Sequence, residues 1–446
     1  MKHKKLYPTL FLIGSILITV RAQHPIRLEQ AVDLTLKNSK QLQLHQAKTE
    51  EAYAALREAE ERKLPNASAS ASYLRLSSAN VDLKIKSTNS GGGTASPPPS
   101  ISQAMYGLIN ASLPIYAGGR INHGIESARL LAEATKLDAA DQKEKIVQTI
   151  VEAYVNLCKA RAAIRLVQEN LNDAKQRVTD LSNLEKNGLL ARNDLMKAEL
   201  QQTNTEYTLV DAENNWHIAN VNMNIMMGLP DSTVLSPDTS QLSQQINLKS
   251  IEDYLQSARN GRHDVAGLDL RKKAAEVGVK SVEAEKYPAI QLTGGYAALN
   301  IPKFVSVTNA LNLGLGVSYN IASLWKLKSK LDQANAHVHQ MAATEAILDD
   351  NIKFQINKTY FNVLSAQKKV EVYTKAIDQA SENYRIVHNK FNNNLATTTE
   401  MLDADVALLQ SRLAQTFMRA DALLAYYQLL QTAGVDLQDF LKTNSK

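Results

Sequence analysis

The chain carries the same plan twice, and this repetition restricts the fold more than any other feature of the sequence. The two copies span residues 28–228 and 251–434. Leu64-Pro65 in the first copy recurs as Tyr287-Pro288 in the second. A slightly shorter constant offset relates the later pairs: Tyr154 and Tyr360, Asn156 and Asn362, Asp194-Leu195 and Glu400-Met401, and Gly228 and Gly434. A period of about two hundred residues is too long for a solenoid. It predicts a protomer built from two equivalent halves that wrap around something or close a ring.

The two offsets differ because the first copy holds an extra loop between two strand-like runs. Its sequence, NSGGGTASPPPS, is dominated by glycine, serine and proline. We expect residues 89–99 to form an external loop of variable length, whose deletion leaves the assembled protein intact.

The first 22 residues are typical of a secretory signal peptide. Three lysines precede an apolar stretch from Leu10 to Val20. We expect cleavage before Gln23, which leaves residues 23–446 as the mature chain. The apolar stretch of about eleven residues is shorter than the roughly twenty that a membrane helix needs. No cysteine directly follows the expected cleavage point, which argues against a lipoprotein anchor.

Without this segment the chain would be nearly neutral. The full sequence has 50 basic and 45 acidic residues, and the segment holds four basic residues and no acidic one, which leaves 46 against 45. This balance gives no reason to expect a nucleic acid partner. The single cysteine, Cys158, lies within a helical pattern, so no disulfide framework is predicted. An exported chain without disulfides fits a bacterial cell envelope.

Each half is predicted to contain one very long helix between shorter ones. In the first half we expect helices at about residues 27–62, 121–185 and 191–228. Apolar residues of the long helix recur at alternating steps of three and four, the period of a coiled-coil seam. The seam consists of Ile146, Ile150, Ala153, Leu157, Ala160, Ile164, Val167, Leu171, Ala174, Val178 and Leu181. The second half repeats it at Ile352, Ile356, Thr359, Val363, Ala366, Val370, Tyr373, Ile377, Ala380, Tyr384 and Val387.

The lengths of these helices suggest how they are arranged. About 65 residues at 1.5 Å each make a helix of roughly 100 Å. The two shorter helices, placed end to end, would match it. This match predicts a cylinder wall in which one long helix runs beside two short ones, although the seam by itself also fits a solvated coiled-coil rod.

Four segments alternate between apolar and polar residues with a period of two: residues 67–85, 105–115, 289–299 and 311–321. Such runs of about ten residues are the signature of a transmembrane β-barrel. A soluble, half-buried sheet is the alternative. We favour the barrel because the four segments occupy equivalent places in a duplicated, exported chain. No window after residue 22 is apolar enough for a spanning helix, so any crossing of a membrane would use strands.

Four strands cannot close a barrel, and open sheet edges are not tolerated in lipid. The barrel must therefore be shared between chains. Two chains would give eight strands, whose interior is filled by side chains, and three would give twelve, with room for a lumen. The strand count thus predicts an oligomer without fixing the number of chains.

Several short segments resemble the TolC-like outer membrane efflux protein family, also called outer membrane factors. They are LPIYAGGR at 113–120, KNGLLARNDL at 186–195, FNNNLATTTEMLDA at 391–404 and MMGLP at 226–230. Their order, spacing and duplication make the resemblance specific over essentially the whole mature chain.

The resemblance implies a mainly α fold with a membrane β-barrel. Duplicated long helical hairpins would form a periplasmic α-barrel, and four strands per chain would contribute to a shared twelve-stranded barrel in a homotrimer. It further implies an outer-membrane exit duct of a tripartite efflux or type I secretion system, in contact with outer membrane lipid. The implied protein partners are a periplasmic adaptor (membrane fusion) protein and an inner-membrane pump of the RND or ABC type.

The resemblance also implies an acidic gate at the periplasmic end. The matching residues are Glu400 and Asp403, which would form two carboxylate rings in a trimer, repel anions and bind cations weakly. The alternative is that both are ordinary acids at a helix N-terminus. Asp194 matches the acid of the first repeat, where Lys197 stands in place of the second carboxylate.

Two positions depart from the family pattern. A tyrosine and an arginine hold the second turn shut in the family's model member, and the aligned residues here are Phe391 and Ala396. We therefore expect that particular latch to be absent, with Arg192, His388 and Lys390 as the candidates to replace it.

We expect no enzyme activity, because the sequence holds no catalytic triad, paired catalytic carboxylates or metal cluster. No cofactor and no metal are predicted. The alternative to a duct is a periplasmic coiled-coil adaptor or scaffold without its own pore. An adaptor would have one hairpin with additional β domains, whereas this chain has two hairpin patterns. The sequence does not identify the transported substrate, the pump or the resting state of the gate.

Overall fold

The computed structural model describes residues 24–79, 101–239, 246–302 and 304–444. The expected signal peptide and the expected external loop at 89–99 lie outside these residues. The chain forms two compact units. In the described part of the chain, the first unit comprises residues 24–39, 144–239, 246–251 and 356–444, and the second comprises residues 40–79, 101–143, 252–302 and 304–355.

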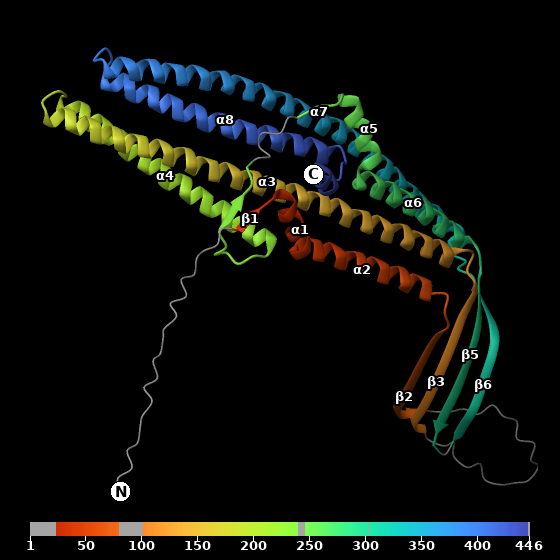
Figure 1. Ribbon diagram of the computed structural model, residues 1–446. Helices are drawn as coiled ribbons and strands as arrows, with labels where there is room; N and C mark the ends of the chain where they lie inside the picture. Colours follow the sequence, from red (N-terminus) through yellow and green to blue (C-terminus); the bar gives the residue numbers. More distant parts are fainter. Residues whose placement is uncertain (1–23, 80–100, 240–245, 303, 445–446) are drawn as a thin grey trace, which may run out of the picture. The chain divides into compact units, whose positions relative to one another are not determined.

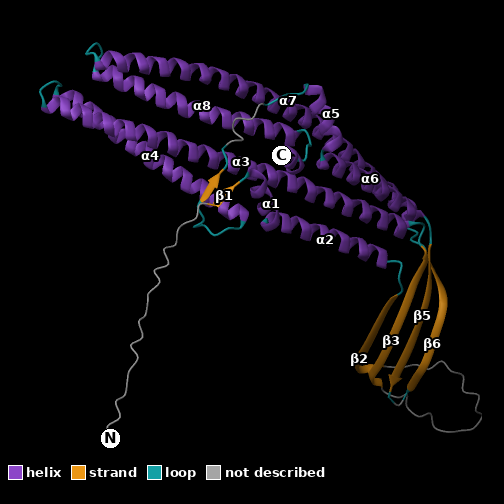
Figure 2. Ribbon diagram, viewed as in Figure 1, coloured by secondary structure: helices purple, strands orange, loops and turns teal. Residues whose placement is uncertain are grey.

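The order of the elements repeats in the two halves, as the sequence predicts (Figures 1 and 2). The helices are α1 Leu28–Asn38, α2 Lys40–Glu61, α3 Arg120–Lys186, α4 Arg192–Met227, α5 Ile251–Gly261, α6 His263–Glu283, α7 Ser323–Asn392, α8 Thr398–Thr432 and α9 Leu437–Asn444. The strands are β1 His24–Ile26, β2 Asn66–Ala79, β3 Ile101–Tyr116, β4 Leu235–Pro237, β5 Ala289–Ile301 and β6 Val305–Ser318. Each half therefore runs through two helices, two strands, a very long helix and a final helix. None of the helices in the described ranges combines the length and apolar character that a membrane span needs.

The predicted helix at 27–62 is wrong in one respect, because it is two helices. The chain breaks at Ser39, whose φ of −66° and ψ of 112° are extended. An equivalent break falls at the matching position of the second copy, Arg262, with φ −75° and ψ 125°. An extended ψ ends the series of helical hydrogen bonds. Neither proline nor glycine precedes Ser39 in α1, so the sequence carries no breaking signal there.

The predicted seam of the long helix is largely buried in α3. Ile150 and Leu157 are fully buried, and Val167 and Leu181 are each 1% exposed. In α7 the seam is buried at Ile352, Ile356, Val363 and Ala366. Beyond Ala366 its members, Val370, Tyr373, Ile377, Ala380, Tyr384 and Val387, are only half-buried. The second copy of the seam thus keeps apolar surface that the described part of the chain does not cover.

In the first unit, a small two-stranded sheet joins the segments that precede and follow the first copy of the repeat. β1 pairs in parallel with β4. The Tyr154 hydroxyl donates a hydrogen bond to the Ile26 carbonyl (2.9 Å) and accepts one from the Asp238 N–H (3.0 Å). Asn220 on α4 donates to the Thr233 carbonyl (2.7 Å), which fixes the segment before β4. These contacts attach both strands to α3 and α4.

Cys158 lies one helical turn beyond Tyr154 on α3 and is 1% exposed. Burial, together with the nearby Asp238, raises the pKa of its thiol to about 12. Because the thiolate is the reactive form of cysteine, this side chain behaves as a small apolar core residue.

The second unit holds a four-stranded antiparallel sheet of order β2-β3-β5-β6. All four predicted strands are present, although β6 ends at Ser318, before the predicted end at 321, and residues 80–85 lie outside the described part. Within the described ranges, β2 and β6 have no strand partner on their outer sides. The sheet therefore keeps two open edges.

The strand register sorts the side chains of this sheet into two faces. One face is mostly apolar and includes Ala67, Ala69, Ala71, Tyr73, Met105, Ile109, Ala111, Leu113, Ile290, Leu292, Tyr296, Leu311, Leu313, Leu315 and Val317. The other face is mostly small or polar and includes Ser68, Ser70, Ser72, Asn110, Ser112, Gln291, Thr293, Gly295, Asn312, Gly314 and Gly316. Leu311, Leu313, Leu315 and Val317 are 81%, 78%, 70% and 70% exposed. The described part of the chain thus leaves this apolar face uncovered along β6.

Candidate functional site at the paired helical turns

The turn between α3 and α4 and the turn between α7 and α8 have the same hydrogen-bond pattern. In the first turn the Leu189 N–H donates to the Leu184 carbonyl at 2.9 Å, and in the second the Leu395 N–H donates to the Lys390 carbonyl at 2.8 Å. Gly188 (φ 73°) and Asn394 (φ 57°) occupy the left-handed position, which glycine and asparagine adopt most easily. Both helical hairpins of the first unit therefore end in equivalent turns.

Each turn exposes one leucine at the same position. Leu189 is 74% exposed and Leu395 is 75% exposed. The two residues are related by the same offset as the other repeated residues of these helices. The described part of the chain leaves both side chains in solvent at the ends of the hairpins.

An apolar cluster lies just behind these turns. Its buried members are Leu181, Leu195, Ala198 and Leu402, and Val178, Leu190 and Phe391 pack against them. The cluster thus joins residues of α3, α4, α7 and α8. Phe391, which stands where the family's model member has a tyrosine, contributes apolar packing here.

Glu400 caps the first turn of α8. Its carboxylate accepts a hydrogen bond from the Thr397 N–H at 2.7 Å, and its own N–H donates to the Thr397 hydroxyl at 3.2 Å. This is a capping box, which satisfies backbone donors at a helix start. The backbone and side-chain hydrogen bonds from Thr397 lower the pKa of the Glu400 carboxyl group, with a smaller contribution from the charge of Lys390. Glu400 is therefore ionised at neutral pH.

The two other predicted acids differ in their surroundings. Asp403 is exposed, and no described residue forms a hydrogen bond or ion pair with it. Asp194, in the first turn of α4, pairs with the ammonium group of Lys197 at 3.3 Å. Lys197 also donates to the Thr399 hydroxyl of α8 at 3.1 Å. Lys197 thus links Asp194 to the start of α8, while the carboxylate of Asp403 stays open to solvent.

Two residues beyond Asp403 lies a buried ion pair that was not predicted from the sequence. Asp405 is 4% exposed and accepts hydrogen bonds from Arg177 at 3.0 Å and from Asn170 at 3.2 Å. Burial by itself would lower the pKa of the Arg177 guanidinium group. The hydrogen bond to Asp405 and the negative charge of Asp405, with a smaller contribution from Tyr384, outweigh the effect of burial and raise this pKa. The signal was available, because Asp405 lies three residues after Leu402, on the buried side of α8.

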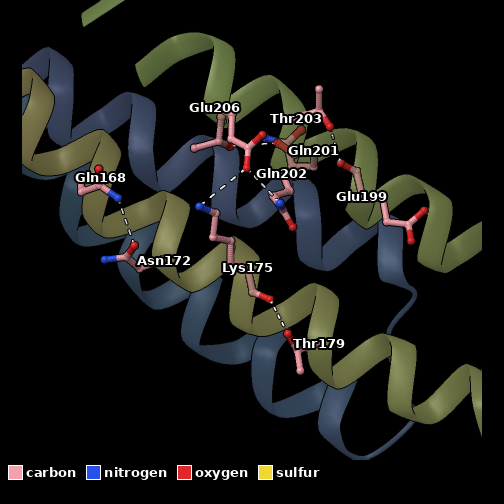
Figure 3. A network of polar contacts seen from close by, with 10 residues as sticks. Gln168, Asn172, Lys175, Thr179, Glu199, Gln201, Gln202, Thr203 and Glu206 are labelled. Carbon is pink, nitrogen blue, oxygen red and sulfur yellow. Dashed lines mark hydrogen bonds and ion pairs between the residues drawn. The ribbon is translucent and has the colours of Figure 1, made fainter. Parts of the chain in front are cut away.

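Further polar contacts tie α3 to α4 and to α8. Figure 3 shows Lys175 of α3 beside Glu206 of α4, with 3.8 Å between nitrogen and oxygen. Glu206 also accepts a hydrogen bond from Gln202 at 3.1 Å. Toward α8, Lys159 pairs with Asp421 at 2.6 Å. Within the described residues, no group of three histidine, cysteine, aspartate or glutamate side chains is arranged to hold a metal ion.

Comparisons with known proteins identify the fold. The sequence model of the outer membrane efflux protein family matches residues 31–229 and 254–435. Among solved structures, CusC is 18% identical, with a TM-score of 0.75 over 92% of this chain and 92% of CusC. VceC from Vibrio cholerae is 18% identical, with a TM-score of 0.74 over 92% and 96% of the two chains. CmeC from Campylobacter jejuni is 16% identical, with a TM-score of 0.73 over 94% and 89%. A comparison with curated proteins finds no match.

Proposed function

The chain belongs to the outer membrane efflux protein family, and from this premise we propose that it is the outer-membrane exit duct of a tripartite efflux or type I secretion system. The family consists of outer membrane channels and not of enzymes. The observation that carries the proposal is the four-stranded sheet, whose apolar face is exposed from Leu311 to Val317 while the opposite face is small and polar. Such a sheet suits a wall between lipid and a water-filled lumen. Transport through it would be passive and would take its energy from the pump.

Three copies of the chain are proposed to close this wall. The two open edges of the sheet, at β2 and β6, need strand partners in lipid, and neighbouring chains can supply them. Four strands from each of three chains give twelve, enough for a lumen. Pairing β6 of one copy with β2 of the next is a head-to-tail contact, and such contacts form a closed ring when the rotation between neighbouring copies is a whole fraction of a full turn.

The helices of the first unit support the same assembly. α4 carries a row of exposed apolar side chains at helical spacing: Met196, Leu200, Tyr207, Val210, Ile218 and Ile225. On α7, Phe361 and Val372 are 60% and 54% exposed. Exposed apolar rows on two helices of a chain are typical of surfaces that pack against another copy. We propose that these rows are covered in the trimer.

The paired turns are the proposed docking site for the periplasmic adaptor, because each presents an exposed leucine. We expect Leu189→Ser combined with Leu395→Ser to weaken adaptor binding by at least about tenfold, since burying one leucine contributes about 1.5–3 kcal/mol. Biolayer interferometry with a purified periplasmic adaptor from the same cells would measure this change. Leu44→Ser, at a leucine of α2 that is 54% exposed, is the control. Equal binding by the double variant and the control would remove the turns from the adaptor interface.

We further propose that Glu400 and Asp403 form the acidic gate, with Asp194 in a lesser role. The ionised Glu400 and the unpaired Asp403 would each provide three carboxylates around the pore axis of a trimer. Such rings attract cations and hinder anions. Asp194 contributes less to this field because Lys197 offsets its charge. The inner-membrane pump would then deliver the substrate to a selective entrance.

Charge removal at the gate is expected to change the channel without unfolding it. Glu400→Gln keeps an oxygen that can accept the capping hydrogen bond, and Asp403→Asn keeps the side-chain shape. We expect this double variant to have a lower cation preference and a larger conductance in planar bilayers. Asp194→Asn is expected to change both values less. Glu50→Gln with Glu51→Gln, two exposed acids of α2, is the charge-matched control. A double variant with the ion selectivity of the wild type would exclude these carboxylates from the gate.

A further inference from the structure

All four connections between the sheet and the helices α2, α3, α6 and α7 lie at the same end of the strands. β2 starts at Asn66, β3 ends at Tyr116, β5 starts at Ala289 and β6 ends at Ser318. The antiparallel register places these four ends together, since Ala289 pairs with Ser318 and Asn66 pairs with Ser112 near the end of β3. We call this the junction edge.

Each crossing of the junction edge carries an exposed basic residue, and the duplication repeats it. Lys63 precedes β2 and recurs as Lys286 before β5, at the offset that relates Leu64 to Tyr287. Arg120 follows β3 and recurs as Lys326 after β6, at the offset that relates Tyr154 to Tyr360. All four basic side chains are exposed. None of them forms an ion pair with a described residue, so four positive charges are left without a partner at this edge.

Large apolar side chains stand directly beside these charges. Leu64, Tyr287 and Trp325, which adjoin Lys63, Lys286 and Lys326, are 59%, 48% and 65% exposed. The ammonium group of Lys286 lies over the Tyr287 ring, 5.3 Å from its centroid. Alternating exposed aromatic and basic residues are typical of the boundary between hydrocarbon and lipid headgroups.

A small cavity next to Arg120 gives this edge a recess. Arg120, Glu285, Tyr287, Ser318 and Asn320 are among the residues that line its 120 Å³. The acid in this set is already neutralised, because the Glu285 carboxylate pairs with Lys330 at 2.5 Å. The guanidinium group of Arg120 therefore keeps its positive charge available beside the hydroxyl and amide groups of the cavity.

The backbone before Arg120 fixes this arrangement. Gly118 has a φ of 64°, and a Cβ at this residue would lie 2.6 Å from the Ala284 carbonyl oxygen and 2.9 Å from the Tyr287 Cβ. The turn after β3 is thus packed directly against the segment before β5. Arg120 and Tyr287, which come from different halves of the duplicated chain, are held at the same recess.

We propose that the junction edge binds the headgroups of anionic glycerophospholipids through Arg120, Lys286, Lys63 and Lys326. The inference rests on the proposed function, because it requires the sheet to lie in a membrane. Charge complementarity favours an anionic headgroup, and the adjoining apolar side chains favour one that carries acyl chains. Arginine offers several N–H donors to a phosphate, while the lysines act as point charges. A free phosphate compound would satisfy the charges and leave Leu64, Tyr287 and Trp325 in water.

The test is lipid binding by the full-length protein, purified in a non-ionic detergent and followed by native mass spectrometry. The probes are dioleoylphosphatidylglycerol, dioleoylphosphatidylcholine and sn-glycerol 3-phosphate. The variant replaces all four basic residues with glutamine: Lys63→Gln, Arg120→Gln, Lys286→Gln and Lys326→Gln. A matched control removes three lysines and one arginine that are exposed elsewhere in the second unit: Lys40→Gln, Lys48→Gln, Arg57→Gln and Lys136→Gln. A charge-preserving variant exchanges lysine and arginine at the four junction positions.

The wild type and the control are expected to bind the phosphatidylglycerol more tightly than the phosphatidylcholine. Each basic residue near an anionic surface strengthens binding by about fivefold, so we expect the glutamine variant to lose at least about tenfold of this preference. The charge-preserving variant should keep it, and added salt should weaken it. An equal loss in the control would overturn the proposal. Binding of glycerol phosphate as tight as that of the lipid would overturn the assignment to a lipid.

A second arm separates this inference from the proposed function. The wild type and the glutamine variant are reconstituted into vesicles of phosphatidylcholine alone and of phosphatidylcholine with phosphatidylglycerol. Insertion into both kinds of vesicle with no effect of the anionic lipid would refute the lipid site and leave the duct intact. Failure of the folded wild type to insert into either would refute the duct.

Discussion

Leu313→Arg is expected to keep the protein out of the outer membrane. Leu313 lies in the apolar row of β6 and is 78% exposed. An arginine on the lipid-facing side of a membrane strand costs about 2–4 kcal/mol near the bilayer centre, and each copy in the assembly would carry one. We therefore expect the outer membrane fraction to lose most of the variant, measured by membrane fractionation and by the yield of refolding into lipid vesicles.

The neighbouring residue provides the control for this experiment. Gly314 is on the opposite face of the same strand, and a Cβ added there would meet no atom within 4 Å. Gly314→Arg places the same charge in the proposed lumen, so insertion should continue and the conductance should change. If both arginine variants insert equally well, the apolar face of the sheet does not contact lipid.

Asp405→Ala is expected to cost about 3–5 kcal/mol of folding free energy, because it leaves the buried charge of Arg177 without its partner. The Arg177 side chain is 11% exposed, so water cannot replace the lost carboxylate. Unfolding of the assembled protein by guanidinium chloride, followed by far-ultraviolet circular dichroism, would measure the change.

Two further variants test whether burial causes this loss. Asp421→Ala breaks the Lys159 ion pair, whose side chains are 23% and 39% exposed, and should cost less than about 1 kcal/mol. Arg177→Met with Asp405→Leu removes both charges and is expected to regain most of the stability, since apolar replacement of a buried pair is often nearly neutral. Equal losses for Asp405→Ala and Asp421→Ala would show that the buried pair has no special role.

Periodicity predicted the long elements of this fold because they repeat a simple pattern over many residues. The seam from Ile146 to Leu181 forms the buried side of α3, and the alternating leucines of β6 form its apolar side. In both elements the spacing of apolar residues shows this side in the sequence. The break at Ser39 was missed because backbone conformation ends the helix without a proline or glycine signal. Asn38, the last residue of α1, donates a hydrogen bond to the Met227 carbonyl of α4 at 2.6 Å, a contact between distant segments that the sequence does not show.

The candidate site was only partly predictable, for a different reason. Glu400, Asp403 and Asp194 were found as acids near two turns. The capping of Glu400 by Thr397 and the pairing of Asp194 with Lys197 follow three-residue spacings that the sequence displays. The contact of Lys197 with Thr399 of α8 joins residues far apart in the chain and comes only from the three-dimensional arrangement. The position of Asp405, three residues after Leu402, indicated its burial, but its partner could not be predicted because Arg177 lies 228 residues away on another helix.

Single-channel recording of the purified wild-type protein in planar lipid bilayers tests the central claim most directly. If copies of this chain close one duct, the assembled protein should produce discrete, cation-selective openings of reproducible size. Protein that is shown to be folded and oligomeric and yet produces no openings at any voltage would contradict the account.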